Sequence, residues 1–532
     1  MSKDRYALIS VTDKAGVLDF AKGLSQEGFR ILSTGGTSDL LKKSGLDVID
    51  VADFTGSPEC LDGRVKTLHP KVHAGILADR SNVNHMKSMK EFNFDLIEVV
   101  AVNLYDFAGN ASGKNMDLEQ AIKFIDIGGP TMLRGAAKNF SHVYSVIDPN
   151  DYPLVLECIR GERSADTLRK TLAGKVFSHI SRYDALIANE FHKSIASTSA
   201  EMKNQLGTVS ELPTSIDLNL VKKNSLRYGE NAHQKAALYG PIGRSEGLIA
   251  ASIIQGKELS YNNYVDLDAA AAIVADLAPS PACTIIKHTN PCGTAVLESG
   301  SSKDLFASAL SSDPKCAFGG IVAFNVEVDE SAALLLAEIF LECIIAPGFS
   351  AAALKILSAK KNLRVMISDV TTKQGRSTER FLRPIAGGYL LQDQDIEKID
   401  SNKWKCLSKI SPQKHQLKEL EFAMTICRHV KSNAIVIAKE GRSIGIGAGQ
   451  MSRIDSARIA IEKAKEIGHS PCHSVVASDA FFPFRDTVDY LANAGVSAIV
   501  HPGGSLKDQE SIDAANEHGI VMMQCEYRHF KH

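Results

Sequence analysis

The feature that most constrains the fold is the regular alternation of short apolar runs with amphipathic stretches near the start of the chain. The runs YALISV and RILST each precede an amphipathic segment. In the segment after YALISV, the apolar residues recur at helical spacing on one face: Val17, Leu18, Phe20, Ala21 and Leu24. Strands that alternate with helices form parallel sheets covered by helices. Residues 1–197 are therefore expected to form an α/β domain with a mainly parallel sheet.

A second module is expected over residues 205–532, because the polar stretch STSAEMKNQLGTVSELPTS, broken by Gly and Pro, is typical of an interdomain connection. Two parts of this module are faintly alike. One is ACTIIKHTNPCG followed by DPKCAFGGIVAF, and the other is AIVIAKEGRSIGIGAG followed by SDAFFPFRD. A duplicated α/β unit would explain the similarity.

Composition excludes several classes of partner. With 532 residues, the chain is too long for one compact core. Its 60 Lys and Arg nearly balance its 62 Asp and Glu, so the net charge would not attract nucleic acid or an anionic membrane. The ten cysteines are scattered without a CxxC pair, which indicates a reduced, cytoplasmic protein. The first residues lack the pattern of a secretory signal, and no apolar run is long enough for a membrane span.

Three polar segments of the first module favour a phosphate site. Residues 10–14 (SVTDK) and 33–37 (STGGT) follow apolar runs, where turns expose backbone N–H groups at a helix start. Either turn alone fits an ordinary connection in which Thr37 caps the next helix. Neither matches a P-loop or GxGxxG, so a dinucleotide or triphosphate is not indicated. Together with the basic segment 63–70 (GRVKTLHP), they predict a monophosphate pocket.

Further along, Asn103 and Tyr105 follow an apolar run, where side chains of a parallel sheet emerge into a crevice. Asp126 precedes a Gly-Gly-Pro break, and Lys138 follows the next helical turns. These charges could surround one ligand, or they could belong to a capped helix with a surface lysine. The spacing leaves both interpretations open.

The adjacent pair Lys287 and His288 stands out in the second module, because it directly follows the apolar run ACTII at an expected strand end. A neighbouring ammonium group disfavours the imidazolium form, so His288 suits a general base. A buried structural histidine is the alternative. The glycines of GIGAG would let a ligand approach the backbone or form a tight turn, and the aromatic segment 478–486 suits a flat ligand or a core edge.

No catalytic metal is expected. The sequence has no HExxH motif, and PCGT at residues 291–294 lacks the second cysteine of the PCxxC signature of zinc deaminases.

Taken in order, the segments resemble one known family: STGGT, GRVKTLHP, NLY, DIGGPT with RGAAKN, RYGENAHQ, LSYNN, KHTNPCG, IIAPGF, SNAI, GIGAGQMSR and SDAFFPFRD. The family is the bifunctional purine biosynthesis enzymes, which join IMP cyclohydrolase to phosphoribosylaminoimidazolecarboxamide (AICAR) formyltransferase. The resemblance implies a methylglyoxal-synthase-like first module and a duplicated, cytidine-deaminase-like second module without zinc. It also implies a homodimer that acts on small molecules in the last two steps of IMP synthesis.

For the second module, the resemblance implies that AICAR and 10-formyltetrahydrofolate bind there. His288 would take a proton from the 5-amino group, Lys287 would stabilise the oxyanion, and Asn433 would orient the amine. The implied nucleotide contacts are Arg227, Tyr228, Gly319, Glu342, Arg453 and Arg528. The implied folate contacts are Ile454, Phe481, Ser505 and Leu506. Glu342 stands where some relatives have Asp, which is one methylene shorter.

For the first module, the resemblance implies closure of formyl-AICAR to IMP. The implied nucleotide contacts are Thr12, Asp13, Lys14, Thr34, Gly35, Gly36, Thr37, Arg64, Val65 and Thr67, with Val102, Asn103 and Ile127 nearer the base. The implied catalytic residues are Lys66, Tyr105, Asp126 and Lys138, with Lys138 as proton donor or acceptor. Another enzyme on these folds, such as a zinc-free deaminase or a methylglyoxal-synthase-like lyase, and a non-catalytic nucleotide sensor are the rival functions.

Overall fold

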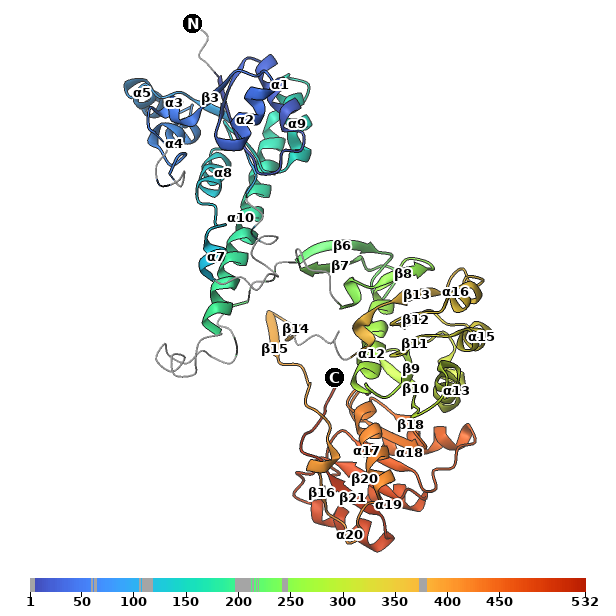
Figure 1. Cartoon of the computed structure of the whole chain (residues 1–532). Coiled ribbons are helices and arrows are strands. Elements are labelled where there is room, and N and C mark those ends of the chain that lie inside the picture. Colours follow the sequence, from blue (N-terminus) through green and yellow to red (C-terminus); the bar gives the residue numbers. More distant parts are fainter. Residues whose placement is uncertain are drawn as a thin grey trace. The chain divides into compact units, whose positions relative to one another are not determined.

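The computed structural model describes residues 5–58, 61, 65–104, 107, 118–196, 212, 215, 216, 218, 220–241, 247–372 and 380–532. The chain divides into two compact units, Met1–Asn219 and Leu220–His532. In Figure 1 the first unit runs from blue to teal, and the second runs from green to red. Each unit is described by itself.

The first unit is built on a five-stranded parallel sheet in the order β3-β2-β1-β4-β5. Its strands are β1 Arg5–Ser10, β2 Phe29–Ser33, β3 Val48–Asp50, β4 Ile97–Val102 and β5 Tyr144–Val146. The predicted α/β fold with a mainly parallel sheet is confirmed. The strand order reverses between β1 and β4, and ligands of such sheets bind at the carboxyl ends of the strands beside that reversal.

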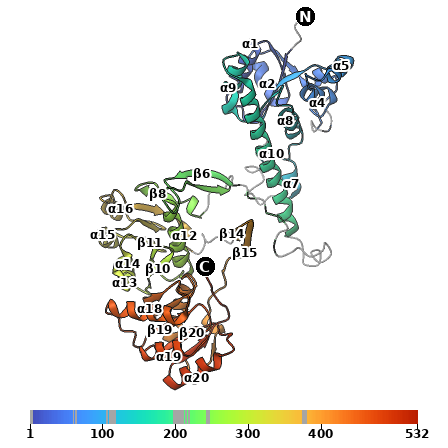
Figure 2. The ribbon, with the colours of Figure 1, turned by 180° about the vertical axis from the view of Figure 1, so that it is seen from behind.

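Helices cover both faces of this sheet because side chains alternate along its strands. Ala7 and Ile9 of β1 pack with α1 Val17–Gln26, α2 Gly35–Lys43 and α9 Tyr152–Ile159. Tyr6 and Leu8 face the opposite way. On that side lie α3 Val51–Thr55, α4 Pro70–Leu77, α8 Gly128–Lys138 and much of α10 Ala165–Ala196. The remaining helices are α5 Val83–Glu91 and α7 Leu118–Ile122, and α7 lies along α10 in both ribbon views (Figures 1 and 2).

The second unit contains a mixed twelve-stranded sheet whose two halves have the same topology. The first half has the order β10-β9-β11-β12-β13-β8, and the second has β18-β17-β19-β20-β21-β16. Corresponding neighbours are parallel or antiparallel in the same way, and β10 pairs with β18 where the halves meet. The faint repeat in the sequence is therefore a structural duplication.

The strands of the first half are β8 Ser252–Gln255, β9 Ala282–Lys287, β10 Asn290–Val296, β11 Ile321–Phe324, β12 Cys343–Ala346 and β13 Arg364–Ile367. Those of the second half are β16 Lys405–Cys406, β17 Ile435–Lys439, β18 Arg442–Gly447, β19 Val475–Ser478, β20 Ala498–His501 and β21 Val521–Gln524. Two separate hairpins are formed by β6 Leu220–Leu226 with β7 Ala236–Pro241, and by β14 Phe381–Ile385 with β15 Gly388–Gln392.

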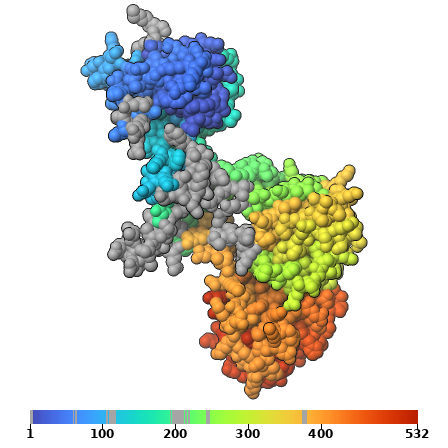
Figure 3. All heavy atoms as spheres, viewed as in Figure 1, coloured from blue at the N-terminus to red at the C-terminus, as the bar shows by residue number. Residues whose placement is uncertain are grey.

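Each half has one long helix on one face of the sheet and three on the other. The single helices are α12 Tyr261–Asp276 and α17 Lys414–Cys427. The opposite face carries α13 Ser302–Ser312, α15 Glu330–Glu338 and α16 Ala351–Leu357 in the first half, and α18 Arg453–Glu466, α19 Asp486–Asn493 and α20 Asp508–His518 in the second. The short α14 is Pro314–Ala317. The two halves pack directly on one another in the space-filling view (Figure 3).

Short 3-10 helices complete the described elements: η2 Pro149–Asp151, η3 Gly247–Ile249, η4 Asp369–Thr371 and η6 Ser401–Lys403. Of the helices in the described ranges, none combines the length and apolar character that crossing a lipid bilayer demands.

Candidate active sites

The first candidate site lies at the carboxyl ends of β1 and β4, where the strand order reverses. Asn103 follows β4, and its side chain is bonded to the loop that follows β1. The Asn103 Oδ1 accepts from the backbone N–H of Thr12 and, at 3.0 Å, from that of Asp13. The Asn103 Nδ2 donates to the Asp13 carbonyl at 3.1 Å. Asn103 therefore holds the loop in place.

Lys14 connects the same loop to the start of α2. Its ammonium group donates to the Val11 carbonyl and, at 2.8 Å, to the Thr37 hydroxyl. Burial lowers the pKa of Lys14, and the charge of Asp13 partly opposes this shift. A cavity of about 590 Å³ opens beside the loop and is lined by Thr12, Asp13, Asn103, Leu104, Ile147, Asp148, Pro149, Lys175, Ser178, His179 and Arg182.

The start of α2 has the features of an anion site. Thr34, not Thr37, occupies the N-cap position, which corrects the interpretation of Thr37 as the cap. The Thr34 hydroxyl is buried and has no hydrogen-bond partner among the residues that the structure describes. The Lys66 Nζ lies 3.5 Å from the position that a Cβ on Gly35 would take, so it sits close to this helix end. A free hydroxyl, a lysine and a helix N-terminus together suit a phosphate.

Thr37 is instead buried in the first turn of α2, where its hydroxyl donates to the Val11 carbonyl at 3.0 Å. It also accepts from the Val11 backbone N–H at 3.1 Å. Thr37 therefore connects the two turns, residues 10–14 and 33–37, that the sequence analysis proposed as parts of a phosphate site. Gly36 follows Gly35 in the first turn of α2.

Asp126 lies at the start of α8, where its carboxylate accepts from the Gly129 backbone N–H at 2.9 Å. Burial raises the pKa of Asp126, and the bond from Gly129 opposes the shift. The Asp126 backbone N–H donates to the Tyr183 hydroxyl at 2.7 Å. Tyr183 lies far along the chain on α10, so the spacing of residues in the sequence could not predict this contact with Asp126.

The neighbours of Asp126 bring the basic segment to the same helix start. The Thr67 hydroxyl would lie 2.6 Å from a Cβ on Gly128, so Thr67 packs against the first residue of α8. Val65 and Lys66 directly precede Thr67 in the chain. Ile127 is exposed, and Val102 ends β4 and is buried. Arg64 and Tyr105 lie outside the described residues.

Lys138 is the last residue of α8, at the opposite end from Asp126. A helix rises about 1.5 Å per residue, so the backbones of Gly128 and Lys138 are roughly 15 Å apart. Lys138 lines a different cavity, of about 720 Å³, with His73, Leu77, Thr131, Arg134, Gly135, Ala137, Phe140, Lys170, Ala173, Gly174 and Phe177. Within one chain the structure does not bring Lys138 to the helix start that holds Asp126.

The second candidate site is centred on the β9–β10 hairpin. β9 ends at Lys287, and the turn to β10 consists of His288 and Thr289, with φ angles of 53° and 64°. Turns of two residues with positive φ match the twist of a hairpin, although they ordinarily use Asn and Gly. The Lys287 Nζ donates to the Phe318 carbonyl at 2.9 Å.

A cavity of about 190 Å³ is lined by Lys287 and His288 together with Asn290, Pro291, Cys292, Ser312, Asp313, Cys316, Gly445, Ile446, Ala448 and Lys463. Burial raises the pKa of Cys292 to about 12 and also raises that of Cys316. Both thiols are therefore protonated near neutral pH and unsuited to act as nucleophiles. His288 places an imidazole among the lining residues of this cavity.

Two of the expected nucleotide contacts lie close to Lys287. Gly319 follows Phe318, and its backbone N–H donates to the Phe340 carbonyl at 2.8 Å. The Glu342 backbone N–H donates to the Gly320 carbonyl at 3.0 Å, so Glu342 belongs to the same edge. The carboxylate of Glu342 forms an ion pair with Arg364. Arg364 is therefore the partner of the Glu342 side chain, which is one methylene longer than the Asp of some relatives.

Arg227 and Tyr228 follow β6, and the Arg227 guanidinium lies 5.5 Å from the centre of the Tyr228 ring. The loop after them is bonded to the start of α12, because the Asn262 side chain donates to the Glu230 carbonyl at 3.3 Å. Asp266 lies one helical turn after Asn262, so α12 contacts both this loop and the hairpin that carries His288.

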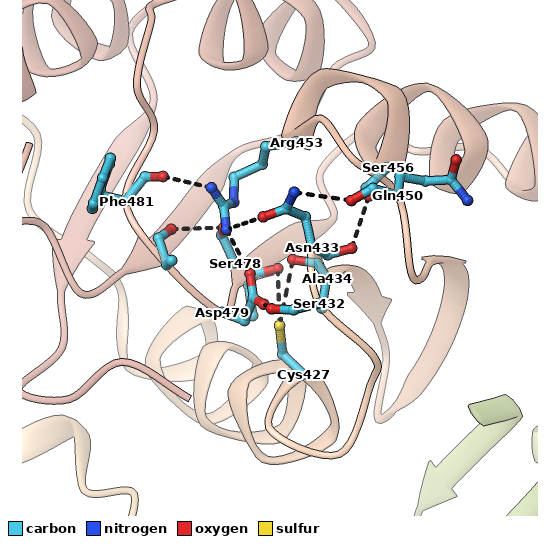
Figure 4. Close-up of polar contacts among 12 residues, drawn as sticks. Cys427, Ser432, Asn433, Ala434, Gln450, Arg453, Ser456, Ser478, Asp479 and Phe481 are labelled. Atoms are coloured by element: carbon cyan, nitrogen blue, oxygen red, sulfur yellow. Dashed lines mark hydrogen bonds and ion pairs between the residues drawn. The ribbon is translucent and has the colours of Figure 1, made fainter. Parts of the chain in front are cut away.

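Half-buried Asn433 and buried Arg453 belong to one hydrogen-bond network (Figure 4). The Arg453 guanidinium donates to the Asn433 Oδ1 at 2.8 Å and to the Asp479 carboxylate at 2.9 Å. It also donates to the Phe481 carbonyl at 2.9 Å. The Asn433 Nδ2 donates to the Gln450 carbonyl at 2.9 Å. Three of the five N–H donors of Arg453 are therefore used within its own chain, and among the described residues its Nε has no hydrogen-bond partner.

The other expected contacts surround this network. Ile454 follows Arg453 in the first turn of α18, and Phe481 follows β19. Ser505 and Leu506 follow β20, and the Leu506 side chain is fully exposed. The Arg528 guanidinium lies 4.4 Å from the centre of the Phe530 ring. The backbone N–H of the next residue, His529, donates to the Asp479 carbonyl, which places Arg528 near the network.

Asn290, which was not among the predicted site residues, joins the two parts of the second site. Its Nδ2 donates to the His288 carbonyl at 3.1 Å, and its Oδ1 accepts from the Lys431 backbone N–H at 3.0 Å. Lys431 lies two residues before Asn433, so the proposed base and the proposed orienting amide lie in one region. In the sequence, the position of Asn290 directly after the KHT motif was the feature that could have indicated its role.

One feature of the sequence has another explanation in the structure. Gly445 and Gly447 lie in β18, where a Cβ would overlap backbone carbonyls of α18, those of Ala460 and Ser456. These glycines allow α18 to pack closely against β18, and Gly445 also lines the cavity that holds Lys287 and His288. Among the residues that the structure describes, no three His, Cys, Asp or Glu side chains are grouped as metal ligands.

Comparison with known proteins places both units among characterised sequences. The family model described as AICARFT/IMPCHase bienzyme matches residues 136–463, and the model of the MGS-like domain matches residues 16–131. The bifunctional purine biosynthesis protein PurH of Anoxybacillus flavithermus (strain DSM 21510 / WK1) is 46% identical over 531 residues, which are 99% of this chain and 100% of the relative. The crystal structure of ForH is 36% identical, covers 36% of this chain and 98% of its own, and has a TM-score of 0.33.

Proposed function

Because this chain belongs to the AICARFT/IMPCHase bienzyme family, we propose that it transfers a formyl group to AICAR and closes the product to IMP. We assign formyl transfer to the second unit, 220–532, and ring closure to the first unit, 1–219. The observation that carries the proposal is the joining of the Lys287–His288 turn to the Asn433–Arg453 network through Asn290. The co-substrate that we propose is 10-formyltetrahydrofolate.

In the second unit, the 5-amino nitrogen of AICAR attacks the formyl carbon. His288 takes the proton that the amine loses, and Lys287 stabilises the negative charge that develops on the formyl oxygen. The tetrahedral intermediate collapses when the bond to the folate nitrogen breaks, and that nitrogen takes up the proton held by His288, which releases tetrahydrofolate. Asn433 has a fixed orientation because its amide is bonded at both ends, so it suits orientation of the amine.

The remaining expected contacts have separate tasks. Arg227, Tyr228, Gly319, Glu342, Arg453 and Arg528 are proposed to contact the nucleotide. Ile454, Phe481, Ser505 and Leu506 are proposed to line the folate side. Exposed Leu506 and half-buried Phe481 offer apolar surface to a folate ring.

In the first unit, the carboxamide nitrogen attacks the formyl carbon of the same molecule, and a water molecule leaves. Both reacting groups are already joined, so the site mainly has to hold the reactive conformer. The α2 start with Thr34 and Lys66 is proposed to bind the phosphate. Asp126, whose pKa is raised by burial, is proposed to act beside the base. Tyr105 and Lys138 are the other catalytic residues that the family resemblance implies, and within one chain Lys138 lies at the far end of α8 from Asp126.

The experiment that tests the proposal uses the full chain with AICAR and 10-formyltetrahydrofolate. Tetrahydrofolate and IMP should both accumulate, followed by absorbance, and formyl-AICAR supplied alone should be converted to IMP. Binding of AICAR without turnover would favour the nucleotide sensor. Release of ammonia from a nucleoside would favour a deaminase.

We also propose that the protein is a cytoplasmic homodimer. The β14–β15 hairpin supports an interface, because four of its apolar side chains are between 46% and 67% exposed: Phe381, Ile385, Tyr389 and Leu390. Light scattering on the purified chain should give twice the mass of 57.4 kDa. A mass of one chain at micromolar concentration would contradict the dimer.

A further inference from the structure

The two halves of the second unit share a device that fixes a hairpin turn. In the first half, the Asp266 carboxylate accepts from the backbone N–H of His288 at 3.3 Å and from that of Thr289 at 2.7 Å. In the second half, the Glu419 carboxylate accepts from the backbone N–H of Gly441 at 2.7 Å. In both cases a carboxylate on the helix that covers the sheet fixes the turn between two antiparallel strands.

The surroundings of the two turns correspond closely. Asp266 is the sixth residue of α12, and Glu419 is the sixth residue of α17. A lysine ends the preceding strand in each half, and both ammonium groups donate to a backbone carbonyl at 2.9 Å, Lys287 to Phe318 and Lys439 to Cys472. The carboxylate is therefore part of the duplicated framework.

The turns differ in how much they need that carboxylate. In the second half the residues of the turn are Glu440 and Gly441, with φ angles of 56° and 72°, and glycine adopts such angles readily. In the first half neither His288 nor Thr289 is glycine, although both have positive φ. A β-branched residue such as Thr is strongly disfavoured there. The half that carries His288 therefore has the less favourable backbone at this turn.

We propose that Asp266 is a positioning residue for formyl transfer, which holds the left-handed His288–Thr289 turn so that His288 reaches the amine. This inference rests on the proposed function of the second unit. Asp266 acts through backbone N–H groups, and bonds to a charged acceptor are stronger than neutral ones. Asn290 holds the same turn from the other side, through the His288 carbonyl. A turn fixed from both sides keeps the imidazole in one place.

The test compares variants of the full chain in both reactions. Asp266→Ala should lower kcat of formyl transfer about a hundredfold, because small displacements of a catalytic group are that costly. The KM for AICAR should change less than about twofold, and ring closure of supplied formyl-AICAR should be unchanged. Adding Thr289→Gly to Asp266→Ala should raise kcat about tenfold above that of Asp266→Ala alone, because glycine adopts this conformation readily.

Glu419 provides the matched control. Glu419→Ala removes the same kind of bond from the turn that lacks the histidine, so formyl transfer should stay within about twofold of the wild-type value. The unfolding midpoint of every variant is measured alongside. Where Asp266→Ala does not fold, Asp266→Asn, with and without Thr289→Gly, gives the same comparison.

Three outcomes would overturn the inference. They are wild-type kcat in Asp266→Ala, an equal loss in Glu419→Ala, and no gain from Thr289→Gly in a double variant as stable as the wild type. A wild-type chain that shows no formyl transfer would overturn the proposed function as well, and this result is distinguishable because it precedes any variant.

Discussion

At the scale of single residues, His288 separates the two proposed reactions. His288→Ala should reduce formyl transfer to background, because a general base contributes about a hundredfold to ten-thousandfold. Ring closure of supplied formyl-AICAR should continue at the wild-type rate, since the first unit has its own core and its own site. Parallel assays of tetrahydrofolate and IMP check this. Loss of both activities would refute independent sites.

Lys138 is the proposed catalytic residue whose position is least expected. It lies at the far end of α8 from Asp126 and lines another cavity. Because the family resemblance assigns Lys138 to proton transfer in ring closure, Lys138→Ala should nevertheless abolish ring closure and leave formyl transfer intact. The rate of IMP formation from formyl-AICAR decides this. Normal ring closure would remove Lys138 from the mechanism, and Lys170→Ala in the same cavity is the matched control.

His501 makes the stability of the second unit sensitive to acid. Its side chain is buried, its Nδ1 accepts from the Gly503 backbone N–H at 3.2 Å, and burial lowers its pKa to about 4. An unfolded histidine has a pKa of about 6.5, so the unfolded state binds the proton first as the pH falls. Stability is therefore full above about pH 6.5 and decreases between pH 6.5 and 4.

His501→Asn should remove this contribution, because Asn can accept the Gly503 bond but does not titrate. The variant should lose less stability than the wild type between pH 7 and 5, by roughly 2 kcal/mol. Denaturant unfolding at both pH values measures the difference. An equal loss of the free energy of unfolding between pH 7 and 5 in the two proteins would contradict this role of His501.

At the scale of elements, glycine at the fourth position of β10 and β18 controls how closely a helix approaches. A Cβ on Gly293 would overlap the Ala309 carbonyl of α13, and a Cβ on Gly445 would overlap the Ala460 carbonyl of α18. Gly293→Ala and Gly445→Ala should each destabilise the second unit by about 1–3 kcal/mol through overpacking. Chemical denaturation measures this. Gly388→Ala, in a hairpin with open space around it, should have little effect.

The elements also show what could be predicted from the sequence. The first sheet was predictable because apolar strands and amphipathic helices alternate in a regular order, and local pattern determines that kind of unit. The duplication was only suspected, because equivalent positions such as Asp266 and Glu419 differ in residue type and share only their place in the helix. Tyr183 and Asn290 gave little signal, since their contacts join segments far apart in the chain.

At the scale of the whole molecule, the chain divides into two compact units. Two core clusters lie on the faces of the first sheet, and four others belong to the second unit. Each unit is long enough to bury a hydrophobic core of its own. The family similarity extends along 99% of the chain, so both activities are expected in one polypeptide. Independent cores predict that neither unit depends on the other to fold.

Separation of the units tests this independence. Residues 1–219, expressed alone, should unfold cooperatively and convert formyl-AICAR to IMP, because the α2 start, Asp126 and Lys138 all lie within them. Residues 220–532 alone should make formyl-AICAR but not IMP. Calorimetry and the two assays measure these outcomes. Loss of ring closure in a well-folded first unit would show that the cyclisation site needs residues of the second, and a double variant, His288→Ala with Lys138→Ala, serves as the inactive reference.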